Sequence, residues 1–452
     1  MSRHVKLDFR LLARPKFTLI LLRALAVLLL STPVILLLLA IETSPSHVAE
    51  QQLSGKELSR IEALLLESTP RSPSYASRHE LQLNSEELNL LLRYAVNIMN
   101  LSSDWVAQTQ LSQGNLNAQL SLRLGAGPIS MYLNAKANFI ENDNLLMLDT
   151  LRIGRISVPN GFLQFTLQRL REELATENVA YQNFSELINN VESVELELNK
   201  MTISLQWDPS LINRVGNQAK QFFISEQDRQ RIIDYYAIIT KIAAVVPIDI
   251  RAVSINAFLS PLFAAAAEKT LAGSDPIAEN RTAFQTLATY LNKESIAQLI
   301  GEEAAAKIEP APFVEARLLR RQDLAQHLVS IAAITASAGA DLAQMLSTTK
   351  EAYDARYRSG FSFSDLTANN VGVSIARLAT SNPETAKIMQ GRLANLQNES
   401  DYMPEVGNNR DGLSETDFNA VYTDRSSPQY LKRLAEIQTL IDTRPLFSGL
   451  LQ

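Results

Sequence analysis

Apolar residues follow three different patterns along this chain, and each pattern predicts a different kind of structure. Residues 17–41 are apolar almost without interruption, residues 79–208 alternate between apolar and polar positions over several short stretches, and helical spacing prevails from residue 211 onward. Unbroken runs of this length are typical of membrane spans, alternation is typical of strands, and spacings of three and four are typical of helices. The sequence therefore predicts an α+β protein with an N-terminal transmembrane helix, an antiparallel-sheet α+β domain and a mostly α-helical C-terminal half.

The run at residues 17–41 is long enough to cross a bilayer. Its last part, residues 24–41, would span about 27 Å as a helix, close to the roughly 30 Å of a hydrocarbon core, and Arg23 could reach the headgroups from its position near one end. A cleaved signal peptide is the alternative. The run is longer than the usual apolar region of about 7–15 residues, however, and no small-residue cleavage site follows it. We therefore expect a membrane anchor.

The charges on either side of this run predict its orientation. Residues 1–16 form a basic tail in which Asp8 is the single acid, whereas Glu42 and Glu50 follow soon after the run. Because cationic segments remain in the cytoplasm, the N-terminus is expected there. The sequence thus predicts a single-pass protein of the bacterial inner membrane, with its bulk in the periplasm and its contact with that membrane made through residues 17–41.

The next segments predict a linker and then a sheet. Residues 42–78 read as a linker with a short helix at 54–67, and residues 79–208 read as the α+β domain. Two helices are expected in that domain, one at 85–100 with a capping box of Asn84 and Glu87, and one at 162–174. Strands are expected at 116–124, 129–139, 145–153 and 194–207, with a turn at Asn199-Lys200.

The second half is predicted to be helical in two parts. Residues 211–313 form one helical region, and residues 314–452 form a helical domain beyond the proline-containing loop at 301–314. Within the latter, we expect residues 398–425 to be mostly loop and the last helix to cover 428–442.

Composition excludes several classes of protein. The 452 residues include no cysteine, so there is no disulfide framework, no thiolate nucleophile and no cysteine-ligated zinc. Lys+Arg 42 against Asp+Glu 48 gives a formal net charge of -6, and no basic stripe interleaved with aromatic residues is present, so nucleic acid is not an expected partner. Nucleotide-binding glycine loops, zinc-protease motifs and serine-hydrolase elbows are also absent from the sequence. An envelope protein or a lipid ligand remains possible as a partner.

Polar residues recur at helical spacing in the last domain and form the candidate site. Asp323 and His327 lie four residues apart and share a helix face, as Asp365 and Asn369 do, with Gly372 continuing the second stripe. A glycine there would let another helix backbone approach closely. The candidate catalytic residues are His327, Glu351, Asp354 and Asp365, and the residues expected to support them are Asp323, Lys350, Asn369 and Gly372.

These residues permit more than one kind of chemistry. One imidazole with several carboxylates suits a divalent metal or a general acid/base pair, and packed carboxylates shift one another's pKa values. The alternative is a paired polar network in which Arg356 and Arg358 neutralise the carboxylates. The spacing matches no standard metal motif, so the sequence assigns neither a metal nor another cofactor. His79, the other histidine of a folded region, is expected to be solvated at the start of a strand.

The same residues carry a resemblance to known families. The run K-E-x-x-D at 350–354, followed by D-L-x-A-N-x-x-G at 365–372, resembles the motif series of YfiM-like lipoproteins and, more distantly, of VanZ-like membrane proteins. The rest of the chain resembles a family of singly anchored proteobacterial membrane proteins. The resemblance implies an envelope location and a shared site rather than a reaction. This chain differs from a lipoprotein because it has no cysteine to carry a lipid.

Two functions are consistent with these observations. The first is a non-catalytic scaffold or binding module of the cell envelope that faces the periplasm, with the polar motif holding the helices together. The second is an anchored hydrolase or phosphotransferase that acts on a lipid-linked or cell-wall intermediate through His327, Glu351, Asp354 and Asp365. Exposure of His327 to solvent would favour the enzyme, and complete pairing of every buried polar atom would favour the scaffold.

Overall fold

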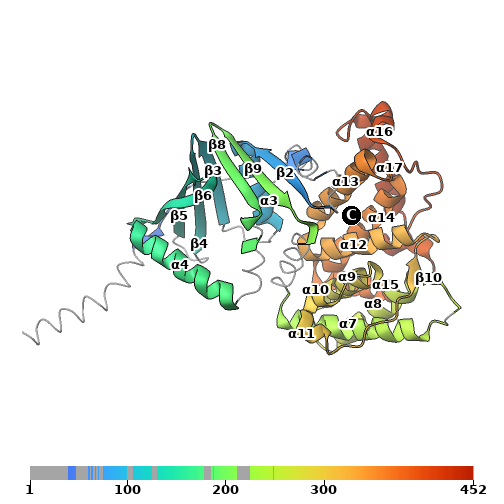
Figure 1. Ribbon diagram of the computed structural model, residues 1–452. Coiled ribbons are helices and arrows are strands. Elements are labelled where there is room, and N and C mark those ends of the chain that lie inside the picture. The colour runs from blue at the N-terminus through green and yellow to red at the C-terminus, as the bar shows by residue number, and fades with distance from the viewer. Residues whose placement is uncertain are drawn as a thin grey trace, which may run out of the picture.

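The computed structural model describes residues 39–46, 75–98, 105–124, 130–177, 185–186, 188–210, 224–247 and 249–450, together with scattered residues between 57 and 70 (Figure 1). In this part of the chain most strands lie in the first half and most helices lie in the second half. The predicted α+β class, with antiparallel sheets followed by a helical half, is confirmed.

A six-stranded antiparallel sheet forms most of the first half. Its order is β3-β4-β5-β6-β7, with β1 pairing beside β5. The predicted strands at 116–124, 129–139 and 145–153 correspond to β4, β5 and β6, whereas β1, β3 and β7 were not predicted. The bounds are β1 Ile41–Glu42, β3 Trp105–Ser112, β4 Asn115–Leu124, β5 Met131–Asn142, β6 Leu145–Ile153 and β7 Ile156–Ser157.

A second sheet of three strands has the order β2-β9-β8, with β2 at Ser77–Leu83, β8 at Val191–Glu197 and β9 at Lys200–Trp207. The predicted turn between β8 and β9 is present, and Asn199 adopts the positive φ of 58° that such a tight turn requires. His79 lies inside β2 and its ring meets Trp207 edge to face. The expectation of a solvated histidine at the strand start is therefore wrong.

Two helices accompany the sheets, as predicted. The first, α3 at Ser85–Ile98, begins with the expected capping box, because the Glu87 amide donates to Asn84 Oδ1 (2.9 Å) and the Asn84 amide donates to a Glu87 carboxylate oxygen (2.9 Å). The second, α4 at Asn160–Glu177, lies below the strands of the six-stranded sheet as drawn in Figure 1. The described residues of the short helix expected at 54–67 are helical.

The basic tail at 1–16 lies outside the described residues, and so does the expected anchor at 17–41 except for its last three positions. Leu39 and Ala40 are helical, but Ile41 belongs to β1 and pairs with Leu133 of β5. The expected helix therefore ends before residue 41, because the chain there takes a place in the sheet. No helix among the described residues is long and apolar enough to cross a membrane.

The second half is a compact group of helices. The bounds are α7 Glu226–Val245, α8 Asn256–Leu271, α9 Pro276–Leu291, α10 Ala297–Ile300, α11 Glu302–Ala305, α12 Gln322–Ala338, α13 Ala340–Tyr357, α14 Phe363–Ser381, α15 Pro383–Ala394, α16 Glu415–Tyr422 and α17 Pro428–Asp442. The last helix has the predicted bounds. The segment 398–425 is mostly loop, as predicted, and contains the short helix α16, capped by the Ser414 hydroxyl.

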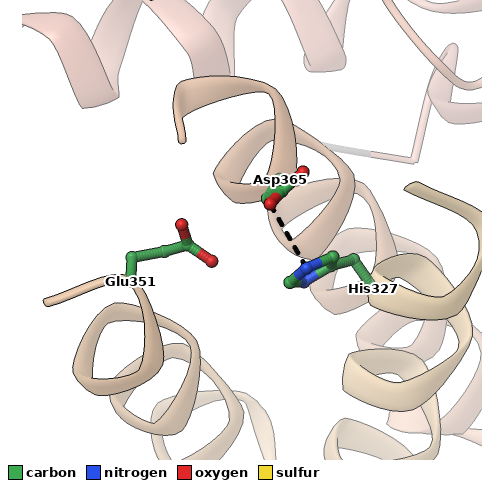
Figure 2. A group of neighbouring side chains, drawn as sticks. All are labelled: His327, Glu351 and Asp365. Carbon is green, nitrogen blue, oxygen red and sulfur yellow. Dashed lines mark ion pairs between the residues drawn. The ribbon is translucent and has the colours of Figure 1, made fainter. Parts of the chain in front are cut away.

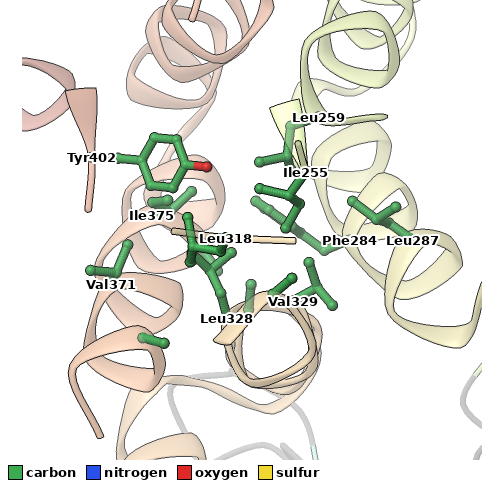
Figure 3. Close-up of a cluster of buried hydrophobic side chains, with 14 of the residues drawn as sticks. Ile255, Leu259, Phe284, Leu287, Leu318, Leu328, Val329, Val371, Ile375 and Tyr402 are labelled. Atoms are coloured by element: carbon green, nitrogen blue, oxygen red, sulfur yellow. The ribbon is translucent and has the colours of Figure 1, made fainter. Parts of the chain in front are cut away.

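One apolar core joins the helices on both sides of the segment 301–314, which was predicted to be a loop but begins with the short helix α11. Figure 3 shows Phe284 of α9 and Leu328 of α12 packed with Val371 of α14 in this core. A short parallel pair of strands, β10 (Ala252–Ser254) and β11 (Glu315–Arg317), also links the two sides. The expected division into a region at 211–313 and a domain at 314–452 thus runs through a shared core.

Helices α12 and α14 approach each other closely at the centre of this core. A Cβ atom added to Gly372 would lie 2.4 Å from the Leu328 carbonyl oxygen and 3.2 Å from the Ala332 amide nitrogen. Only a glycine can occupy that position without pushing the helices apart. The predicted close approach at Gly372 is therefore present, and it sets the positions of the polar side chains one and two turns earlier on the same helix.

Candidate functional site

Three helices bring three of the predicted residues together. His327 comes from α12, Glu351 from α13 and Asp365 from the first turn of α14. One ligand atom from each lies within 4.8 Å of the other two. Figure 2 shows the imidazole and the two carboxylates turned toward a common centre. Residues separated by as many as 38 positions in sequence thus form one cluster, which we call the His-Glu-Asp cluster.

The start of α14 is fixed by its own cap and by a distant loop. The Ser362 hydroxyl accepts from the Asp365 amide (3.1 Å) and so caps the helix. Asp411 in turn accepts from the Ser362 hydroxyl and from the Ser364 amide, both at 2.9 Å. Two of the free amides at this helix end are therefore satisfied, and Asp365 is held in the first turn, facing the cluster.

Asn369 determines which nitrogen of His327 carries the proton. Its side-chain amide donates to Ser347 Oγ (2.7 Å), so its carbonyl oxygen faces His327 Nδ1 at 3.1 Å and accepts the ring proton. Nε2 is then left with a lone pair, 3.4 Å from Asp365 Oδ2. Asn369 is fully buried, so water does not compete for these hydrogen bonds. When the ring is neutral, this arrangement leaves Nε2 able to bind a cation or accept a proton.

Glu351 is a buried carboxylate that is only half satisfied. One oxygen accepts from the Ser362 amide (3.1 Å), but Oε1 is buried and has no hydrogen-bond partner. The side chain is 1% exposed. Burial raises the pKa of Glu351 to about 7, although Lys350 and His327 act to lower it. An unsatisfied buried oxygen is costly, and the Glu351 carboxylate that carries it is turned toward His327 and Asp365 (Figure 2).

Lys350 supplies a positive charge to the same place. Its ammonium lies 2.8 Å from Asp354 Oδ2, 3.6 Å from Glu351 Oε1 and 3.4 Å from His327 Nε2. Burial acts to lower the pKa of Lys350, but the carboxylates of Glu351 and Asp354 outweigh it and the pKa lies above its usual value. The side chain is 51% exposed, so the ammonium reaches the cluster from solvent.

Arg321 holds the other side of the cluster. Its guanidinium donates to Asp365 (3.1 Å), to Asp411 (3.1 Å) and to Asp323 (2.6 Å). Asp323 therefore pairs with Arg321 rather than meeting His327, as its helical spacing had suggested. Arg356, one of the two arginines expected to neutralise the carboxylates, pairs with Glu415. Arg321 and Lys350 lie against the carboxylates of the cluster.

Three contributors were missed in the sequence, and only some of them left a signal there. Ser362 stands three residues before Asp365 in the pattern typical of a helix cap, which could have been recognised. Arg321 immediately precedes a predicted helix that contains Asp323 and His327. Asp411, by contrast, reaches the cluster from 46 residues beyond Asp365, and no local pattern marks it.

The cluster combines donors that suit two kinds of chemistry. His327 and Asp365 are 12% and 16% exposed, so solvent reaches the cluster although Glu351 beneath them is buried. One imidazole nitrogen and two carboxylates can hold a divalent cation, or they can pass a proton. A scan against protein-family models, a search of curated proteins and a search of solved structures each found no match to this chain.

Proposed function

We propose that this protein is a hydrolase or phosphotransferase of the cell envelope that holds a divalent metal ion between His327, Glu351 and Asp365. The observation that carries the proposal is the convergence of three ligand atoms, one each from His327, Glu351 and Asp365, within 4.8 Å. Glu351 also has a buried carboxylate oxygen, Oε1, without a hydrogen-bond partner. A cation at this point would satisfy Glu351 Oε1 and the lone pair of His327 Nε2 together.

The donor set indicates the class of metal. Calcium and magnesium prefer oxygen ligands alone, and soft copper prefers sulfur, whereas zinc and manganese accept imidazole with carboxylates. The supporting residues fit the same view, because Asn369 orients the ring of His327, Arg321 orients Asp365 and the Ser362 amide orients Glu351. Outer contacts of this kind fix the geometry of metal ligands in proteins.

Three protein ligands leave positions for water and substrate, which is the arrangement of catalytic rather than structural metal sites. The ion would lower the pKa of a bound water so that it can attack a phosphoryl or acyl group near neutral pH. Asp354 lies outside the ligand set and pairs with the Lys350 ammonium at 2.8 Å. When a metal enters, Lys350 can turn outward from its half-exposed position while Asp354 keeps its charge near the site.

The location of the substrate follows from the sequence. The apolar run at 17–41 and the basic tail before it predict an inner-membrane anchor with the site on the periplasmic side. Substrates within reach of an anchored site are lipid-linked or cell-wall intermediates, which carry the phosphoryl and acyl groups that metal sites of this kind hydrolyse. We therefore assign the substrate to that class.

A non-catalytic scaffold is the second candidate, and the position of Lys350 favours it. The ammonium already lies within 3.6 Å of Asp354, Glu351 and His327, so it can serve as the cation that a polar network between three helices needs. In this alternative the cluster fixes the packing of α12, α13 and α14, and the protein acts by binding an envelope partner or a lipid.

Metal analysis of the full-length chain separates the two candidates. Protein purified without chelator, and then incubated with Zn²⁺ or Mn²⁺ and desalted, is compared with His327→Ala by elemental analysis. The control is His79→Ala, which removes the histidine of β2 far from the cluster in sequence. We expect near-stoichiometric metal in the unmodified chain and in His79→Ala, and loss of the metal in His327→Ala.

Circular dichroism must show that His327→Ala still folds, so that loss of metal can be assigned to loss of a ligand. A chain that takes up neither ion, and whose melting temperature falls on replacing His327, contradicts the metal-dependent enzyme and supports the scaffold. If metal is bound, metal-dependent hydrolysis of a phosphodiester probe, bis(p-nitrophenyl) phosphate, then tests the reaction class.

A further inference from the structure

Residues 39–46 are attached to the six-stranded sheet by several hydrogen bonds. The Arg155 amide donates to the Leu39 carbonyl (2.8 Å), and β1 pairs with β5 directly afterward. Farther along, the Ser46 amide donates to Ser121 Oγ (3.0 Å), and the Asn134 side chain donates to the Ser44 carbonyl (3.0 Å). The end of the apolar run at 17–41 is thus attached to one end of the sheet without a flexible linker.

The turn at the same end of the sheet lies in close backbone contact with that segment. Gly154 lies at the turn between β6 and β7 with a positive φ of 53°, and a Cβ atom there would lie 2.5 Å from the carbonyl oxygens of Leu39 and Ala40. The close backbone contact needs a glycine. A membrane entered by residues 17–41 would therefore lie next to the turn at 154–155.

Helix α4 begins five residues after that turn and presents aromatic side chains to solvent. Phe162 is 62% exposed and Phe165 is 59% exposed, whereas Leu163 between them is buried against the sheet. Spacing of three residues places the two phenylalanines on one face of the helix, opposite to the face that packs. Leu39 adds a further apolar side chain, 37% exposed. Exposed aromatic residues gathered in this way mark a surface that contacts something apolar.

Cationic side chains lie on the same helix and near the turn that precedes it. Arg169 lies over the ring of Phe165 (5.8 Å to the ring centre), one further turn along the same face, and Arg152 and Arg155 are exposed at the turn that contacts Leu39. Aromatic rings flanked by arginine are typical of segments that lie in the headgroup region of a bilayer. The acidic Glu172 follows on α4, so the pattern is confined to the first turns of the helix.

We propose that the first turns of α4, with Phe162, Phe165 and Arg169, lie in the headgroup region of the membrane that residues 17–41 enter. Chain continuity selects this occupant, because α4 begins five residues after the turn whose backbone contacts Leu39 at the end of the apolar run. The arginines at 152, 155 and 169 complement the anionic headgroups of an inner membrane. The anchor and α4 then hold the sheet at two points, which restricts its tilt. This inference does not depend on the proposed metal site.

The absence of cysteine from the whole chain allows a direct test. The full-length protein carrying Phe165→Cys is labelled with an environment-sensitive NBD fluorophore and reconstituted at one copy per nanodisc containing phosphatidylglycerol. The control is Leu271→Cys, at a helix end in the second half where the side chain is 90% exposed. Lipids with a nitroxide at a shallow acyl position quench fluorophores at the interface, and iodide quenches those in water.

We expect a blue-shifted emission at position 165 that shallow nitroxide lipids quench and iodide does not, with the opposite behaviour at position 271. Shallow quenching should exceed quenching by a nitroxide deep in the acyl chain, since interfacial helices enter only about 5–10 Å. Iodide quenching at 165 equal to that at 271 overturns the proposal. A blue shift that appears only when nanodiscs hold two copies assigns the patch to a second chain and also overturns it.

Discussion

At the scale of single residues, the cluster depends on the side-chain amide of Asn369. This amide contacts His327 at Nδ1 and not at Nε2, the nitrogen proposed to bind the metal. Asn369 holds the Nδ1 proton of His327 and is itself held by Ser347, so it decides the direction of the Nε2 lone pair. A side chain that cannot accept from Nδ1 leaves the ring free to adopt the other tautomer or to rotate. His327 would still be present, but its Nε2 lone pair would no longer be held in one direction.

We therefore predict that Asn369→Ala lowers the affinity for Zn²⁺ or Mn²⁺ by about 10–100-fold, the usual cost of losing an outer contact of a metal ligand. Titration calorimetry on the full-length chain measures it. The matched control is Asn370→Ala, because Asn370 is also buried but accepts from Gln344 rather than from His327. An equal loss of affinity in both variants would assign the effect to packing of α14 and not to the tautomer.

Lys350 is the residue at which the two proposed functions differ most. If a metal belongs in the cluster, the ammonium competes with it, and Lys350→Gln should bind Zn²⁺ or Mn²⁺ more tightly, by about 5–10-fold for a lost repulsion near 1 kcal/mol. If the ammonium is itself the required cation, the variant leaves Glu351 and Asp354 without it. The melting temperature then falls, and added metal does not restore it. Calorimetry and thermal melts of the same sample decide between the two.

Sequence predicted much of this cluster because helical spacing is local. Asp365 and Asn369 lie one turn apart, so their shared face follows from the helix alone, and the resemblance at 350–372 grouped them with Glu351. The partners of these residues could not be predicted in the same way. Arg321 and Lys350 lie against the acids because the crossing of three helices decides which cation reaches the centre. That crossing is a tertiary property.

At the scale of elements, the crossing of α12 and α14 is set by Gly372. We predict that Gly372→Ala destabilises the protein by about 1–3 kcal/mol, because its Cβ would meet the Leu328 carbonyl at 2.4 Å and a helix backbone cannot yield as a side chain does. His327 lies one residue before Leu328, so metal affinity should fall as well. Urea denaturation and titration calorimetry measure the two effects.

Gly391 on α15 provides the control for this substitution. It is also a helical glycine, but a Cβ there would meet nothing within 4 Å. Gly391→Ala should leave metal binding unchanged and raise stability by about 0.4–1 kcal/mol, since alanine restricts the unfolded chain more than glycine does. Similar behaviour of the two alanine variants would show that the close approach at Gly372 does not limit the packing of the helices.

The N-terminus of α14 depends on Asp411, and this dependence should vary with pH. Burial acts to raise the pKa of Asp411, but hydrogen bonds from Ser364, Ser362 and Arg321 outweigh it and hold the pKa below its usual value. A lowered folded-state pKa contributes stability that is present above the ordinary pKa of about 4 and is lost as the pH falls through the folded value.

Asp411→Asn should therefore melt below the unmodified chain at pH 7, by about 2–4 °C for a loss of about 1 kcal/mol, a small figure because the partly exposed carboxylate is screened by solvent. The difference should shrink below about pH 4, as Asp411 loses its charge in the unmodified chain. Thermal melts by circular dichroism between pH 3 and 7 provide the measurement. A difference that stays constant with pH would mean that the side chain acts through its shape alone.

Element prediction succeeded where one face of a segment is buried and failed where a strand depends on a remote partner. The alternation at 116–139 and the capping box at Asn84 are local, and the sequence placed them correctly. Strand β10 has three residues and exists because it pairs with β11 about sixty positions later. Similarly, Ile41 continues the apolar run in sequence, yet it pairs with Leu133 of β5. This pairing is available because β6 covers that edge of β5 only from Ala135 onward.

At the scale of the whole molecule, each apolar cluster among the described residues belongs to one half of the chain. The main core and its satellites draw on residues 224–450, whereas a separate cluster draws on residues 64–203 of the sheets. Each half therefore has its own source of stability. The halves also carry different proposed roles, since the patch on α4 concerns the membrane and the His-Glu-Asp cluster concerns chemistry. Damage to one role should leave the other intact.

This division predicts which fragments fold. A fragment of residues 224–452 keeps the whole main core, the β10–β11 pair and all three helices of the cluster, so it should melt cooperatively and bind metal within about twofold of the full-length chain, a difference below 0.5 kcal/mol. A fragment of residues 314–452 begins at the loop that the sequence marks as a boundary, yet it lacks Phe284 and the other core residues of α8 and α9.

The shorter fragment should therefore fail to melt cooperatively, because removing α8 and α9 exposes the apolar faces of α12 and α14 that they cover. Circular dichroism melts and urea titrations of both fragments, beside the full-length chain, provide the measurement. Cooperative folding of 314–452 would restore the boundary at 301–314 and show that the contacts across it add little. Failure of 224–452 would instead mean that the sheets support the helical half, and the proposed metal site would then have to be studied only in the full-length chain.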